Sequence, residues 1–141
     1  MFNGQCEAAF RFYERCFGGK LDLFTYGDSP DAQRVPPEWR GKIVHATLTT
    51  GDNVLQGADV LPEHYERPKG FSVMLSIEDP AEAERIYHVL AENGTVVMPM
   101  QKTFWSPGFA VLVDRFGTPW EISTTQATSG ANGNPPGRSN Q

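Results

Sequence analysis

The same order of secondary-structure signals occurs twice along the chain. The first copy begins with "CEAAFRFYERCFGG", whose apolar residues fall on one helical stripe before two glycines. The second begins with "EDPAEAERIYHVLAENG", which has an Asp-Pro start and an Asn-Gly stop. These patterns predict helices near residues 5–17 and 80–92. Each helix is followed by three short segments typical of strands, so we expect two equivalent modules.

The strand signals make the repeating unit more specific. The first helix precedes "KLDLFTY" and "KIVHATLTTGDNVLQG", and the second precedes "TVVMPMQ" and "FAVLVDRFGTPWEIS". Gly51-Asp52 and Gly117 mark hairpin turns within the longer segments. Because another strand, "GFSVMLSIE", precedes the second helix, the unit is βαβββ. Repetition at a spacing of about 70 residues indicates a duplicated α+β module rather than a solenoid.

The first copy is shorter than the second at its start. Only Met1-Phe2-Asn3 precede its helix, so we expect a truncated first strand. Either the chain begins inside that strand, or the sheet lacks it and leaves an edge for a partner subunit to cover. We interpret residues 1–126 as one domain, with module one at 1–60 and module two at 70–126. Residues 127–141 contain no large apolar residue and are predicted to be a disordered tail.

Composition and charge narrow the class of protein. In 141 residues, 39% of them hydrophobic, no run approaches the roughly 18 apolar residues of a membrane span, and the start does not have the pattern of a signal peptide. We therefore expect a cytoplasmic protein with no membrane partner. A net charge of −5 without a basic cluster argues against nucleic-acid binding. Cys6 and Cys16 would lie about 15 Å apart on one helix, so we expect reduced, buried thiols.

Alternation in "KIVHATLT" divides this strand into two faces. We expect one set to pack under the helices: Val44, Ala46 and Leu48. The other set then lies on the opposite face: Ile43, His45, Thr47 and Thr49. The same rule sends Trp120 and Ile122 to the helix side and Glu121 to the open side, and it can send Gln56 there too.

A carboxylate on the open face raises the question of its partner. If the sheet curls, Glu121, Gln56 and His45 converge in a concave cavity, where a buried carboxylate needs a metal, a cation or a hydrogen-bond donor. Glu121 equally fits a solvated sheet face, and His45 a cavity or core histidine. Phe104 and Trp105 fit either a cavity rim that stacks on a flat ligand or a buried loop plug. The chain has no Gly-rich phosphate loop, nucleophile elbow or Cys-x-x-Cys motif.

Several stretches resemble one known family. "FNGQCEAAFRFYERCFGG", "GKIVHATLTTGDNVLQGAD" and "MPMQKTFWSPGFAVLVDRFGTPWEI" are similar to the vicinal-oxygen-chelate superfamily of glyoxalases, bleomycin-resistance proteins and extradiol dioxygenases, and in particular to its PhnB-like branch. The resemblance covers roughly residues 2–125. It implies paired modules whose strands form a curved mixed sheet around a cavity, commonly in a homodimer.

The resemblance also implies where metal ligands would lie. In metal-using members they come from the first and fourth strands of each module, which here gives Gln56 and Glu121 at the fourth-strand positions. The first-strand positions fall at or before Met1 and near Phe71-Ser72, and supply no histidine. With His45 added from a third strand, Glu121, Gln56 and His45 are the candidate ligands for zinc, nickel, manganese or iron.

The residues and the resemblance together imply two possible functions. The first is a binding protein that holds a small molecule in the cavity without the usual four-ligand metal site, through His45, Thr47, Gln56, Phe104, Trp105 and Glu121. The alternative is a divalent-metal-dependent lyase, isomerase or dioxygenase that acts on a substrate with vicinal oxygens. A methyltransferase is not favoured, because the chain has no Gly-rich strand-to-helix turn for an adenosyl donor.

Overall fold

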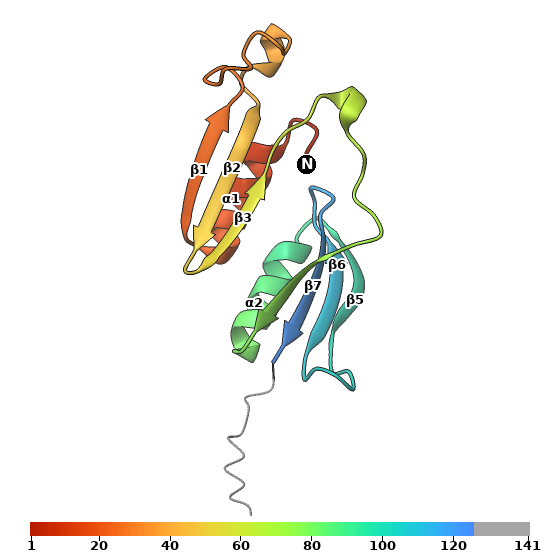
Figure 1. The fold of residues 1–141 in the computed structure, drawn as a ribbon. Coiled ribbons are helices and arrows are strands. Elements are labelled where there is room, and N and C mark those ends of the chain that lie inside the picture. The colour runs from red at the N-terminus through yellow and green to blue at the C-terminus, as the bar shows by residue number, and fades with distance from the viewer. Residues whose placement is uncertain (126–141) are drawn as a thin grey trace, which may run out of the picture.

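A computed structural model describes residues 1–125 of the chain as two modules, each with one helix on one face of a sheet (Figure 1). The predicted tail at 127–141 lies outside the described residues. Module one contains α1 (Cys6–Phe17), β1 (Lys20–Thr25), β2 (Ile43–Thr50) and β3 (Asn53–Gly57), with a 3-10 turn at Pro37–Trp39. Module two contains β4 (Val73–Ile77), α2 (Pro80–Ala91), β5 (Thr95–Gln101), β6 (Phe109–Val113) and β7 (Pro119–Thr124).

Strand order confirms the predicted duplication and the α+β class. The first sheet has the order β1-β2-β3 and is antiparallel. The second has the order β4-β7-β6-β5, in which β4 and β7 are parallel and the other pairs antiparallel. The two sheets are not joined to each other, so β3 and β4 are both edge strands.

Phe2 takes the place of a first strand in module one. Its amide donates to the carbonyl of Ala58 at 2.9 Å, and the amide of Val60 donates to the Phe2 carbonyl at 2.9 Å. The resulting bridge between Phe2 and Asp59 is parallel, as is the pairing of β4 with β7 in module two. Among residues 1–125, Phe2 is thus the one residue at the first-strand position of module one that pairs, through an isolated bridge.

Both helices form where the sequence predicts them. In α2 the Asp79 side chain accepts a hydrogen bond from the Ala81 amide at 3.0 Å, and Pro80 occupies the first helical turn, where its missing amide hydrogen costs nothing. The buried side chains of this helix are the predicted stripe: Ala83, Ile86, Tyr87 and Leu90. They pack with α1 and the inner faces of the sheets into a single core cluster.

One face assignment in β2 is wrong. Ala46 and Leu48 are buried as predicted, but Ile43, expected on the open face beside His45, is only 2% exposed. The pairing with β1 explains the difference, because His45 lies opposite Phe24 while Ile43 lies opposite Thr25. An extra residue in β2 at this point is a β-bulge, which breaks the alternation and turns Ile43 toward the core.

The connection between the modules crosses the second sheet. It leaves β3, makes a 3-10 turn at Pro62–His64 and passes in front of β7 and β6 before it enters β4 (Figure 1). We call residues 67–72 of this connection the strap. Among the helices of residues 1–125, none is long and apolar enough to cross a membrane.

Candidate functional site

Glu121 occupies the centre of β7 on the face away from the helices. Its neighbours in sequence, Trp120 and Ile122, are buried in the core, which confirms the predicted alternation. Glu121 itself is half-buried. The residues opposite it are Met74 on β4 and Val111 on β6. The carboxylate is therefore flanked by apolar side chains on both adjacent strands.

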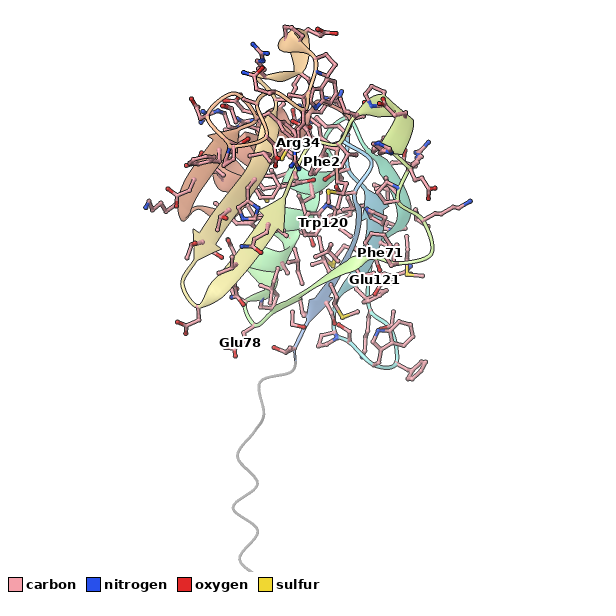
Figure 2. All side chains as sticks on the ribbon, turned by 45° about the horizontal axis from the view of Figure 1, so that its top comes forward. Phe2, Arg34, Phe71, Glu78, Trp120 and Glu121 are labelled. Atoms are coloured by element: carbon pink, nitrogen blue, oxygen red, sulfur yellow. The ribbon has the colours of Figure 1, made fainter. Side chains whose placement is uncertain are left out.

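Glu121 lines a pocket of about 570 Å³ between the second sheet and the strap. The sheet contributes Glu121 and a largely apolar floor: Val97, Val111, Leu112, Val113 and Pro119. The strap contributes the opposite wall: Arg67, Pro68, Lys69, Gly70, Phe71 and Ser72. Figure 2 shows Phe71 close to Glu121, and we call this space the strap pocket.

The charged groups of the strap pocket are unpaired. Glu121, Arg67 and Lys69 take part in none of the ion pairs or side-chain hydrogen bonds formed within residues 1–125. Arg67 and Lys69 are exposed, whereas Glu121 is half-buried. The pocket thus contains charges of both signs that do not neutralise each other.

A second polar group lies on the open face of the first sheet. Thr47 on β2 is directly opposite Gln56 on β3. The Nε2 atoms of Gln56 and His45 are 3.4 Å apart, and His45 is exposed. The structure therefore brings together three of the candidate residues, but none of the three lines the strap pocket that contains Glu121.

The aromatic pair lies in the connection from β5 to β6. Phe104 is 98% exposed and Trp105 is 54% exposed, so the interpretation of this pair as a buried loop plug is wrong. Their rings meet edge to face at 4.6 Å, and Trp105 also contacts the Phe109 ring at 5.2 Å. Neither residue lines the strap pocket. Their role as a rim for a flat ligand stays a prediction.

The sequence interpretation missed the strap. Its residues, "RPKGFS", have no periodic pattern that would predict a helix or a strand. The available signal was local: two cations and an aromatic residue next to a proline and a glycine. A second hollow was also missed. It has a volume of about 570 Å³, lies between β3 and β4, and reaches down to Phe17 and Trp120.

The residues present do not fit the metal site implied by the family. No group of three or more His, Cys, Asp or Glu side chains among residues 1–125 is arranged to hold a metal ion. Glu121 has Met74 and Val111 opposite it, neither of which supplies an oxygen or nitrogen ligand from its side chain. Zinc and iron sites in proteins normally have at least three such ligands. Glu121 alone does not make one.

Module two is a complete βαβββ unit, and module one repeats its order with Phe2 in place of the first strand, an arrangement of the glyoxalase class. The chain belongs to the Glyoxalase/Bleomycin resistance protein/Dioxygenase superfamily, whose family model matches residues 1–122. The resemblance noted from the sequence is thereby confirmed.

Individual relatives agree with this assignment. Protein PA1353 from Pseudomonas aeruginosa is 41% identical, with 89% of this chain and 93% of that chain covered and a TM-score of 0.81. The PhnB protein from Bacillus cereus has the same fold at 24% identity, with a TM-score of 0.70 and 89% and 95% of the two chains covered. Protein YjdN of Escherichia coli strain K12 is 29% identical over an alignment of 134 positions that covers 89% of this chain and 91% of that protein.

Proposed function

We propose that this protein binds a small molecule in the strap pocket and does so without the four-ligand metal site of the metal-using members of its superfamily. The observation that carries the proposal is the half-buried, unpaired carboxylate of Glu121 on the floor of an apolar pocket. A carboxylate that has lost part of its water without gaining a partner is unfavourable by itself. A ligand that donates a hydrogen bond to Glu121 would relieve that cost.

Pocket size and lining support the same conclusion. A volume of about 570 Å³ lies within the range of small-molecule sites, which are mostly apolar with a few polar groups that orient the ligand. Val97 and Val111 supply apolar contact, and Phe71 supplies an aromatic surface that is 60% exposed. The strap would close over a ligand from the side opposite the sheet.

A homodimer is part of the proposal. Exposed apolar side chains lie on the two edge strands, outside the strap pocket: Val54 on β3 at 57% and Met74 on β4 at 55% exposure. Patches of this kind commonly mark interfaces, and the edges of β3 and β4 add unpaired backbone groups. A dimer could also bring the His45, Thr47 and Gln56 group to a bound ligand. Light scattering tests this part, and a single-chain mass at micromolar concentration would contradict it.

We also propose a cytoplasmic location. Cys6 and Cys16 are both free thiols that are buried on α1, and such thiols persist in a reducing compartment.

The binding proposal is tested by filling the strap pocket. Val97 lines the pocket and is 64% exposed, so Val97→Trp should occupy the ligand volume with little effect on the core. The adjacent Val96 is 43% exposed and does not line the pocket, which makes Val96→Trp the matched control. Ligand-observed NMR with a fragment collection, on protein treated with a chelator, would identify binders. Circular dichroism would confirm that both variants fold.

The expected result is a set of fragments that bind the parent and Val96→Trp but not Val97→Trp. Fragments that bind all three proteins equally would place the ligand site elsewhere and refute the proposal. Binding that appears only after a divalent metal is added would favour the enzymatic alternative.

A further inference from the structure

Resting on the proposed function, we infer that the strap pocket selects a zwitterionic ligand, with a protonated amine at one end and an acidic group at the other of a small apolar or aromatic body. The inference comes from the separation of charges in the pocket. Negative charge lies on the sheet, at Glu121, and positive charge lies on the strap, at Arg67 and Lys69.

The floor of the pocket favours an amine. Glu121 is the one acidic residue among those that line it, and Met74 and Val111 lie on either side. An ionised carboxylate is an acceptor, so it requires a donor from the ligand. An ammonium group satisfies that need best, because it offers three donors and a full positive charge to the carboxylate.

The strap favours an acid. Elsewhere in the described residues, arginines commonly have an acidic partner, as Arg85 has Glu82 and Arg115 has Glu92. Arg67 and Lys69 have none. Other cations among residues 1–125 also lack an acidic partner, namely Arg15, Arg40, Lys42 and Lys102, but none of these four lines the strap pocket. Two unpaired cations on the same pocket wall are suited to a carboxylate or phosphate of a ligand.

Glu121 on the sheet and the cations on the strap can both be paired only by a ligand that reaches from one to the other. No ion pair joins Glu121 to either cation, so the pocket retains both charges in separate places. Phe71 on the strap and Val97 on the sheet lie in the same pocket and offer apolar contact to the body of the ligand. A molecule with only one charged group would leave the other end of the pocket unsatisfied.

Three related probes separate these contributions. L-Phenylalanine carries both groups on an aromatic body, phenethylamine lacks the acid, and phenylpropionate lacks the amine. Titration by NMR at millimolar concentrations should show the tightest binding for phenylalanine. We expect each single-charge probe to bind roughly tenfold more weakly, which corresponds to about 1.4 kcal/mol.

Two variants of the protein then test which pocket residues bind the amine and which bind the acidic group. Glu121→Gln should weaken phenethylamine roughly tenfold and leave phenylpropionate unchanged. The double variant Arg67→Gln, Lys69→Gln should do the reverse. The double variant Lys20→Gln, Arg34→Gln removes the same charge from outside the pocket and serves as the control, with no effect expected on either probe.

The outcomes distinguish this inference from the proposed function. If neutral aromatic fragments bind in a manner that depends on Val97 but the three probes bind equally, the pocket is real and the charge selectivity is wrong. If no probe binds at millimolar concentration while neutral fragments do, the inference is also refuted. If nothing binds in a manner that depends on Val97, both fail.

Discussion

The hydroxyl of Tyr13 on α1 donates a 2.6 Å hydrogen bond to Oδ2 of Asp114, which follows β6 in the other module. Asp114 is buried, and its carboxylate also accepts from the Trp120 indole at 2.9 Å and from the amides of Phe116 and Thr118 at 2.8 and 3.0 Å. The first module's helix is thus tied to the turn that precedes β7, the strand that carries Glu121. We expect this bond to contribute to the association of the modules.

Tyr13→Phe should lower the free energy of unfolding by about 1.5–3 kcal/mol, because the hydroxyl bonds to a buried charged group that would lose one of its donors. Urea denaturation measures the difference. Tyr65→Phe is the control, since the Tyr65 hydroxyl forms no hydrogen bond within residues 1–125. Equal stability of parent and Tyr13→Phe would show that the bond does not hold the modules together.

Stability should also fall at alkaline pH in a manner that depends on Tyr13. Burial raises the pKa of its hydroxyl well above the usual value, and the Asp114 charge raises the pKa further. As pH rises above about 10, the unfolded chain loses this proton while the folded chain keeps it. Folding is then progressively less favourable as the pH rises. Below about pH 10 the stabilising contribution of the Tyr13 hydroxyl is fully present. The free energy of unfolding, measured by urea denaturation from neutral pH to above about pH 10, should decline less steeply for Tyr13→Phe than for the parent.

Both cysteines should resist thiol reagents in the folded protein. Burial raises the pKa of Cys6 to about 12 and that of Cys16 to about 11, so little reactive thiolate forms at neutral pH. We expect slow labelling of native protein by a disulfide reagent and rapid labelling of two thiols in urea. Rapid modification of either cysteine without denaturant would mean that α1 opens readily.

Gly94 should tolerate no side chain. A Cβ at this position would overlap the carbonyl oxygen of Val113, a backbone atom that cannot move aside easily. Gly94→Ala should therefore destabilise the fold by about 2 kcal/mol or more. At Gly41 an added Cβ meets nothing within 4 Å, so Gly41→Ala is the matched control and should change stability by at most about 1 kcal/mol. Similar melting temperatures for the two variants would contradict the close approach of the turn between α2 and β5 to the end of β6.

The sequence predicts the framework well because its signals are local and periodic. Asp79 and Pro80 identify the start of α2, and alternation around Glu121 assigns its face. Ile43 could not be assigned in this way, because a bulge depends on the partner strand and leaves no mark in the sequence of its own strand. The strap was missed for a related reason: an irregular connection is placed over the sheet by tertiary structure rather than by its own pattern.

The site was only partly predictable for the same physical reasons. Alternation correctly placed Glu121 on the open face and grouped His45 with Gln56. It could not reveal that the two sheets are separate, which leaves these residues in different places. Contacts between modules depend on the packing of α1 and α2, and no short motif specifies that packing.

The most direct test of the central claim is the melting temperature of the parent and of Glu121→Gln, each titrated with zinc, nickel, manganese and iron after chelator treatment. A binding pocket that needs no metal predicts that no metal stabilises the parent through Glu121, and that the variant without metal is within about 1 kcal/mol of the parent or more stable. Stabilisation of the parent by one of these metals, lost in Glu121→Gln, would contradict the account and establish Glu121 as a metal ligand.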